Sequence, residues 1–398
     1  MQTTGFVVLS GFNLRAVLAI CRSFERSGAA YAVLARGDDD PILRTRYRRR
    51  VAAWIHPVRL DIPELLQAFG RARVKLGVDR LVLLPTAEYS NRLFLEHRAR
   101  LEGEAATFLP LPDCDTYLAV SEKKRFSELC SARGIAIPRE FPPGVPERFP
   151  FAAKPSAEFA ADGKRCYPYL VHDDAGRRAF LQRERAGDYY FQEFVGGRSY
   201  YLLFYFFRDG RVVSHCQRNG AQQPGGKSIV FAWTEPFPQP ELQAQFATLF
   251  RDLGFHGLVM VELKGEPGGF RMIEANPRVW GPMQLAQDAG VDLIACYAEE
   301  YAQMRRAAPH PRRRPYLWLG GFVQTRTAGA SDVWFAGGRR ALWRDLARLP
   351  VHDIFLRPDS AGLFAHEILG SLRTLRPGHT PVLMPSALPV PDRKDPAA

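Results

Sequence analysis

The sequence predicts a parallel, doubly wound α/β domain at the N-terminus, followed by an α+β part built on antiparallel strands. The first observation is an apolar run at residues 5–10, an amphipathic stretch at 14–28 that ends at a glycine, and a second apolar run at 30–35. Strand, helix and strand in this order form a βαβ unit. The second observation is that residues 189–195 and 198–207 are apolar, aromatic runs joined by two glycines, which is typical of antiparallel strands.

The N-terminal domain is expected to span residues 1–115. The run LVLLPTAEYS (81–90) indicates another strand of its sheet, with Thr86, Glu88 and Tyr89 at the carboxyl end of that strand. Open α/β sheets bind their ligands at this end. Glu88 is therefore either a ligand contact or an ordinary acid in the first turn of a helix, and both interpretations stay open.

A capped helix and a lone lysine follow in residues 116–188. The stretch VSEKKRFSELCSARGIAIP has a Ser/Glu start, an apolar period of three to four residues and a stop at Gly134. Lys154 is the only charge in the strand-like run 149–155, so it either extends from the strand end into water or points at an anion. The small, polar residues 156–164 are consistent with a mobile loop over a phosphate chain.

The most informative stretch is GLVMVELKGEPGGFRMIEANPRVWG (257–281), the one place where carboxylates lie inside apolar strand sequence. It predicts a hairpin with a Gly/Pro turn, followed by a helix at 283–304. If Lys264 faces Phe270 across the turn, alternation places oxygen ligands on one face and apolar side chains on the other. The oxygen ligands are Glu262, Glu274 and Asn276, and the apolar set is Val259, Val261, Leu263, Ile273 and Ala275. Such oxygens suit Mg²⁺ bound with nucleotide phosphates. The alternative is a half-exposed hairpin whose acids are solvated.

The composition is that of a globular protein, with 46% hydrophobic and 12% aromatic residues. The net charge of +12 favours anionic ligands, but no basic run is interleaved with aromatics as in a nucleic-acid-binding face. The six cysteines are scattered, and the longest apolar run, residues 200–207, is too short to span a bilayer. We expect a cytoplasmic protein with no nucleic-acid or membrane partner, and a homodimer is left open.

The C-terminal part of the chain is harder to interpret. Residues 305–315 form a Pro/Arg linker, and residues 305–375 are expected to be an extension of mixed strands and helices. The Pro-rich tail at 376–398 is expected to be disordered.

Two stretches resemble the ATP-grasp superfamily, and within it the single-chain carboxylate-amine ligases. EANPRVWGPMQLAQDAGVD is similar to the family's E-x-N-P-R-x-x-G metal-and-substrate motif, and EKKRFSELCSARGIAIP is similar to its entry into the nucleotide domain. The resemblance extends to about Met304. It implies a two-part ATP-grasp domain at 116–304, with subdomains at 116–188 and 189–304.

The resemblance also implies a role for each matched residue. The metal, Mg²⁺ or alternatively Mn²⁺, would be held by Glu262, Glu274 and Asn276. The phosphates of ATP would meet Lys154 and Lys123, although alignment could confuse the latter with Lys124. The adenine amino edge would meet Glu193 and the backbone at Val195. Arg218 would lie near the γ-phosphate. Arg278 would meet the acyl substrate or the transferred phosphate.

The implied reaction is an ATP-dependent ligation. A carboxylate attacks the γ-phosphate of ATP, ADP leaves, and an amine or similar nucleophile displaces phosphate from the acyl phosphate. Amino acids, a peptide or a carrier-protein-bound acyl group all remain open as substrates. The chain departs from the family in three places. Glu122 replaces the usual Asp before the lysine, a mild change; the loop after Lys154 is poor in glycine; and Arg198, Ser199 and Tyr200 stand where relatives place an acid for the ribose.

Two other function classes compete with a ligase. A catalytically weak or inactive nucleotide-binding module with a protein partner is supported by the glycine-poor loop and the basic linker, while the intact metal triad argues against it. A dinucleotide-binding oxidoreductase is disfavoured because the first βα turn lacks GxGxxG.

Overall fold

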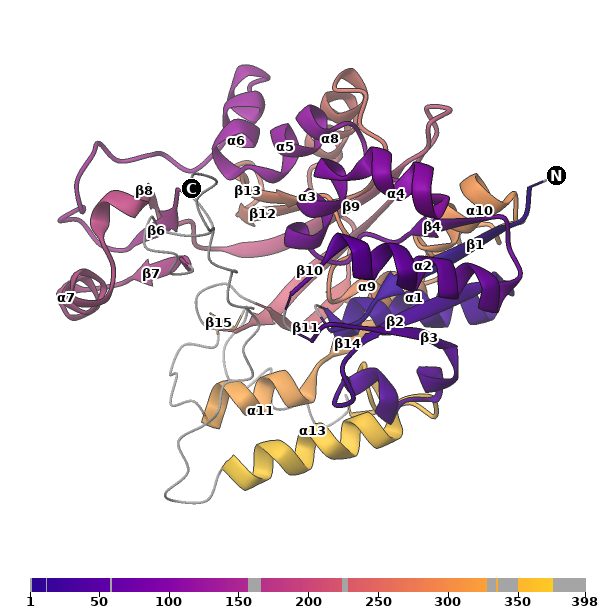
Figure 1. Ribbon diagram of the computed structural model, residues 1–398. Coiled ribbons are helices and arrows are strands. Elements are labelled where there is room, and N and C mark those ends of the chain that lie inside the picture. Colours follow the sequence, from indigo (N-terminus) through magenta and orange to yellow (C-terminus); the bar gives the residue numbers. More distant parts are fainter. Residues whose placement is uncertain are drawn as a thin grey trace, which may run out of the picture.

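The N-terminal part of the computed structural model is a five-stranded parallel sheet in the order β3-β2-β1-β4-β5 (Figure 1). The structure describes residues 2–11, 13–57, 59–156, 166–223, 228–327, 334–335 and 350–374. The strands are β1 (Thr4–Leu9), β2 (Tyr31–Arg36), β3 (Val51–Ile55), β4 (Arg80–Leu83) and β5 (Thr107–Phe108). The helices are α1 (Leu14–Ser27), α2 (Ile62–Leu76), α3 (Glu88–Glu96) and α4 (Arg98–Ala105).

Helices cover both faces of this sheet, which confirms the doubly wound prediction. Phe6 and Val8 of β1 pack with α1, whereas Val7 and Leu9 pack with α2. Helix α1 ends where the sequence predicted, because Gly28 adopts a left-handed φ of 73°.

A small antiparallel sheet, β7-β6-β8, follows two short helices. These elements are α5 (Cys114–Ser121), α6 (Lys123–Ala132), β6 (Phe151–Pro155), β7 (Tyr169–Val171), α7 (Asp174–Arg183) and β8 (Tyr189–Glu193). The predicted loop at 156–164 lies almost entirely outside the described residues.

A seven-stranded sheet forms the centre of the molecule, in the order β13-β12-β9-β10-β11-β14 with β15 paired to β10. Its strands are β9 (Arg198–Phe206), β10 (Val212–Gln222), β11 (Ile229–Thr234), β12 (Gly257–Gly265), β13 (Arg271–Asn276), β14 (Pro315–Leu317) and β15 (Trp334–Phe335). One face packs on α6 and α8 (Pro240–Asp252), and the other packs on α1 and on the two helices after β13. Helix α1 and the two helices after β13 thus lie between the N-terminal sheet and the central sheet and join them in one core.

Two expected elements differ from the structure. The runs at 189–195 and 198–207 were expected to form neighbouring strands, but β8 belongs to the small sheet and β9 to the large one. The chain passes from the small sheet to the large one at the two glycines. Gly197 has a φ of 87°, and a Cβ on it would lie 2.7 Å from the carbonyl oxygen of Gly265. The expected helix at 283–304 is two helices, α9 (Met283–Asp288) and α10 (Ala295–Ala302), because Gly290 turns with a φ of 84°.

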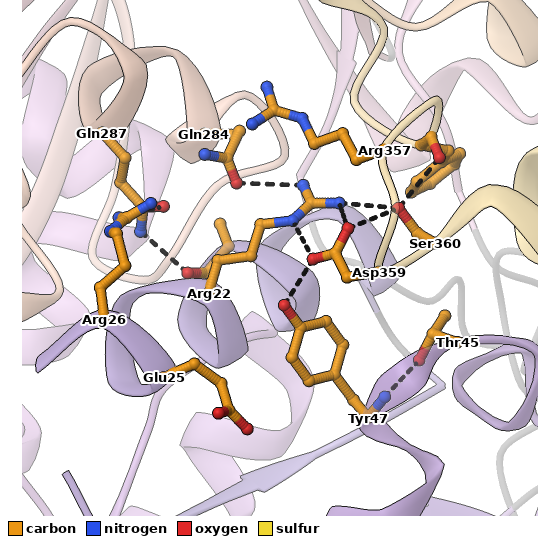
Figure 2. A network of polar contacts seen from close by, with 12 residues as sticks. Arg22, Glu25, Arg26, Thr45, Tyr47, Gln284, Gln287, Arg357, Asp359 and Ser360 are labelled. Atoms are coloured by element: carbon orange, nitrogen blue, oxygen red, sulfur yellow. Dashed lines mark hydrogen bonds and ion pairs between the residues drawn. The ribbon is translucent and has the colours of Figure 1, made fainter. Parts of the chain in front are cut away.

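The residues after 304 do not form a separate body. Strands β14 and β15 join the central sheet, while α11 (Leu319–Thr327) and α13 (Ala361–Thr374) pack on each other. Before α13, Asp359 accepts hydrogen bonds from Arg22 Nε at 2.7 Å and Nη2 at 3.0 Å, and Gln284 of α9 accepts one from Arg22 Nη1 at 3.0 Å (Figure 2). The predicted tail at 376–398 lies outside the described residues.

None of the helices in the described ranges combines the length and the apolar character needed to cross a membrane.

Candidate functional site

The hairpin β12–β13 places two glutamates side by side. Glu262 pairs with Glu274, and Asn276, two residues further along β13, shares their face. The expected single face of oxygen ligands is therefore confirmed. Its expected register is wrong, because Lys264 pairs with Arg271 and not with Phe270.

The register differs because Ile273 is an extra residue in β13. Glu262 pairs with Glu274 but Leu263 pairs with Met272, so Ile273 forms a bulge. Ile273 was expected on the buried face, but it is only half-buried, and Met272 occupies the core instead. The bulge has a consequence for the site, because the Ile273 carbonyl accepts a hydrogen bond from Lys154 Nζ at 3.1 Å.

Three lysines from different elements converge on these acids. Lys123, the first residue of α6, places its Nζ 3.2 Å from Glu274 Oε2, and Lys264 Nζ lies 3.3 Å from Glu262 Oε1. Lys154 comes from β6 of the small sheet and is buried. Lys124 is exposed, so the structure brings Lys123 and not its neighbour to the acids. The site is thus built at the junction of the two sheets and a helix.

The charges of these groups depend on one another. Burial raises the pKa of Glu262, and Lys264 offsets only part of that effect. For Glu274, burial also acts against the charge, but Lys123 and a hydrogen bond from Asn276 Nδ2 at 2.9 Å lower its pKa to about 2. Burial and the neighbouring Lys123 lower the pKa of Lys154 to about 8. Burial likewise disfavours the charge of Lys123, but Glu274 more than compensates and raises its pKa.

Arg278 follows the hairpin and meets the N-terminal sheet. Its Nη2 lies 3.4 Å from Asn276 Oδ1, and the next residue, Val279, donates from its backbone N–H to the Pro85 carbonyl at 2.8 Å. The guanidinium of Arg15 from α1 lies against Gly281, because a Cβ there would lie 2.8 Å from Arg15 Cζ. The carboxyl end of β4 and the acidic hairpin therefore share one junction.

Arg218 is not brought to this junction. It pairs with Tyr200, which lies on the face of the central sheet that packs on α6 and α8, whereas Glu262 pairs with Tyr201 on the opposite face. Alternation along β10 thus directs Arg218 away from the acids. It forms an ion pair with Glu235 at 3.3 Å and lies over the Trp233 ring.

The side chain of Glu193 also points away from Lys154. Its Oε1 accepts from the Arg139 backbone N–H at 3.0 Å and forms an ion pair with Arg271 Nε at 3.0 Å. Tyr190 pairs with Lys154 and shares its face, and so does Gln192 two residues later, whereas Glu193 lies on the opposite face. The half-buried Val195 lies in the crossing from β8 to β9.

Sequence reasoning missed a buried polar row beside Glu262. Ser199 Oγ donates to Glu262 Oε1 at 3.5 Å, Asn219 Nδ2 donates to Ser199 Oγ at 2.9 Å, and Gln217 Nε2 donates to Asn219 Oδ1 at 2.8 Å. All three side chains are fully buried. The available signal was the spacing of Gln217 and Asn219, two amides two positions apart in β10, which alternation places on one face.

Two further side chains beside Lys154 were missed. Tyr190 Oη and Gln192 Oε1 are buried, and neither has a hydrogen-bond partner among the described residues. Leaving such atoms unpaired costs roughly 1–3 kcal/mol each, so these atoms are suited to a bound ligand.

The acidic hairpin fits a divalent cation. No group of three or more His, Cys, Asp or Glu side chains in the described ranges could hold a metal. A magnesium site would instead combine two carboxylates with the amide oxygen of Asn276, an all-oxygen set of the kind that Mg²⁺ prefers. Glu262 is only 4% exposed and burial disfavours its charge, so a cation would stabilise the charged form.

No protein-family model and no curated protein matches the sequence. Solved structures do match. N5-carboxyaminoimidazole ribonucleotide synthetase from Thermus thermophilus is 17% identical, with a TM-score of 0.59 over 87% of this chain and 98% of that one. An L-amino acid ligase from Bacillus licheniformis is 13% identical, with a TM-score of 0.57 over 80% of each chain. A β,γ-ATP complex of biotin carboxylase from Campylobacter jejuni is 13% identical, with a TM-score of 0.57 over 76% of this chain and 72% of that one. These are ATP-grasp enzymes, and the chain has their fold.

Proposed function

We propose, from this ATP-grasp fold, that the protein is an ATP- and Mg²⁺-dependent ligase that joins a carboxylate to an amine through an acyl phosphate. One observation carries the proposal: Lys123 from a helix, Lys154 from the small sheet and the Glu262–Glu274 pair from the central sheet converge at one place. Phosphoryl transfer needs positioned charges more than a covalent nucleophile, and these residues supply them.

Each residue has a stated task in this proposal. Glu262, Glu274 and Asn276 would hold Mg²⁺, or Mn²⁺ with the same oxygen preference, which supplies charge neutralisation at the phosphates. Lys123 and Lys154 would leave their present contacts with Glu274 and the Ile273 carbonyl and bind phosphate oxygens.

The two ends of the nucleotide have different neighbours. The backbone from Glu193 to Val195 would meet the adenine amino edge, and the unpaired Tyr190 and Gln192 would line the space between it and Lys154. Arg278 would contact the acyl substrate or the transferred phosphate. Arg218 has no role in this proposal, since it faces the other side of the sheet.

The site of action is proposed to be the cytoplasm, where ATP and Mg²⁺ are supplied and scattered cysteines stay reduced.

The test is ADP release from Mg-ATP with pairs of amino acids offered as carboxylate and amine. Release with particular pairs is expected for the natural sequence. Glu274→Ala should lower it by about 100-fold or more, because it removes a metal ligand. Glu266→Ala is the matched control: it lies in the turn of the same hairpin, its side chain is 62% exposed, and it should retain activity.

Full activity in Glu274→Ala would refute the site. If Mg-ATP raises the melting temperature but no pair releases ADP, the nucleotide-binding module with a protein partner becomes the better explanation.

A further inference from the structure

Tyr201 of β9 lies directly beside the two glutamates of the acidic hairpin. It pairs with Glu262, which in turn pairs with Glu274, so three neighbouring strands place these side chains in one row. Alternation along β9 sets Tyr201 on the same face as the glutamates, while Tyr200 lies on the opposite face. Paired residues of antiparallel strands have their Cα atoms about 5 Å apart. The tyrosine therefore adjoins the proposed metal position.

The Tyr201 hydroxyl is close to charged groups of both signs. Burial raises the pKa of this hydroxyl, and the nearby Glu262 and Glu274 raise it further. Arg278 acts in the opposite direction and lowers that pKa, as does Arg15 of α1, so both guanidinium groups are within electrostatic reach. The hydroxyl thus borders both the proposed metal position and the arginine that is proposed to contact the acyl substrate.

This hydroxyl forms no hydrogen bond with any other described residue. The other two tyrosines of β9 do form one: Tyr200 donates to Glu235, and Tyr205 donates to Glu300. The ring of Tyr201 is held in the core, and the residue is only 6% exposed. A buried phenol usually has a hydrogen-bond partner. The Tyr201 hydroxyl is therefore a fixed donor that is suited to a bound ligand.

The second step of the proposed reaction needs such a donor. The amine nitrogen attacks the carbonyl carbon of the acyl phosphate, and the carbonyl electron pair moves onto the oxygen, where negative charge develops. The pair then returns, the bond from carbon to the phosphate oxygen breaks, and the departing phosphate takes the proton that the amine loses. A phenol, whose ordinary pKa is about 10, can donate a hydrogen bond to the charged oxygen throughout without transferring a proton.

We propose that Tyr201 is a catalytic residue whose hydroxyl donates a hydrogen bond to the carbonyl oxygen of the acyl phosphate. The proposal rests on the ligase function above and adds a residue to which the family resemblance gives no role. Lys123, Lys154 and the metal act on the phosphates, whereas Tyr201 acts on the carbonyl group at which the amide forms.

Tyr201→Phe separates the two steps of the reaction, because it keeps the ring and removes only the hydroxyl. In a single turnover with enzyme in excess, the amide should form about 100-fold more slowly from the amino-acid pair that releases ADP fastest, since a donor to the developing charge is lost. With the carboxylate alone, positional isotope exchange in ATP reports the reversible formation of the acyl phosphate. The rate of this exchange and the KM for ATP should be unchanged.

Tyr205→Phe is the matched control, because it removes a hydroxyl from the same face of the same strand. It breaks the hydrogen bond to Glu300, so the midpoint of urea denaturation should fall while the rate of amide formation stays the same. Tyr201→Phe should show the opposite pattern, with an unchanged midpoint, since its hydroxyl has no partner to lose among the described residues.

The proposal is overturned if Tyr201→Phe forms the amide at the natural rate, if isotope exchange slows by the same factor as amide formation, or if the slower rate comes with a loss of stability. If the natural sequence shows neither isotope exchange nor ADP release with any carboxylate, the ligase function itself fails and this proposal falls with it.

Discussion

Lys154 is the least compensated charge of the candidate site. Its ammonium contacts a neutral carbonyl, and burial together with Lys123 lowers its pKa to about 8. Lys123, by contrast, has Glu274 as a direct partner, which raises its pKa. The groups that act on Lys154 are Lys123, Glu274, Glu262 and Lys264. A phosphate would therefore stabilise the charged form of Lys154 more than that of Lys123.

This difference predicts how ATP affinity depends on pH. Lys154 is charged below its pKa of about 8 and neutral above it, so the affinity for Mg-ATP should be constant below that pH and weaken above it. The loss should approach about tenfold per pH unit. Isothermal titration calorimetry would measure this loss of affinity between pH 6.5 and 9.5, which is about 1.5 units on either side of that pKa.

Lys154→Arg is the control, because a guanidinium keeps its charge throughout this range. Its affinity should vary little with pH. An equally steep decline in Lys154→Arg would assign the pH dependence to another group.

At the scale of elements, strand alternation decides which residues reach the site. The family resemblance implies that Arg218 lies near the γ-phosphate, but one position along β10 reverses the direction of a side chain. Gln217 and Asn219 share the face of Glu262, whereas Arg218 lies on the face that packs on α6 and α8 and pairs with Glu235.

Arg218→Gln should therefore affect stability and leave ATP binding intact. Removing the guanidinium leaves Glu235 with hydrogen bonds from Tyr200 and Trp233, so the free energy of unfolding should fall by only about 1–2 kcal/mol. Urea denaturation would measure this change. A tenfold or larger rise in the KM for ATP, with unchanged stability, would place Arg218 at the phosphates after all.

The parts of this fold that could be predicted from sequence are those that depend on local sequence patterns. The βαβ unit, the turn of the acidic hairpin and the shared face of its oxygen ligands follow from apolar periodicity and glycine positions. The bulge at Ile273 could not be foreseen, because it depends on how β13 fits against β12. The separation of β8 from β9 likewise depends on the close approach of Gly197 to Gly265, which is a tertiary contact.

At the scale of the whole molecule, the C-terminal residues close the structure onto its first helix. Asp359 binds Arg22 of α1 and accepts a hydrogen bond from Tyr47, and Arg22 also binds Gln284 of α9 (Figure 2). Helix α9 directly follows the E-x-N-P-R-x-x-G motif. This network therefore connects three distant parts of the chain, and no local pattern in the sequence predicts it.

Asp359→Asn should destabilise the whole protein in a pH-dependent way. Burial acts against the charge of Asp359, but Arg22 and Tyr47 lower its pKa to about 2, below the value of roughly 3.9 expected in the unfolded chain. A lowered pKa contributes stability that is present above the unfolded value and is lost as the pH falls through the folded value. At pH 7, about three units above the unfolded pKa, the free energy of unfolding of the variant should thus be lower by about 2–3 kcal/mol. This difference should vanish near pH 2.

Asp252→Asn provides the comparison that isolates the network. Asp252 also pairs with an arginine, Arg133, but the two side chains are 46% and 49% exposed. Water screens such a pair, so its loss should cost less than about 1 kcal/mol at any pH. Urea titrations of both variants at several pH values would test this contrast. Equal losses in the two variants would mean that the C-terminal residues contribute no more than an ordinary surface ion pair, and that α9 is held by its apolar packing alone.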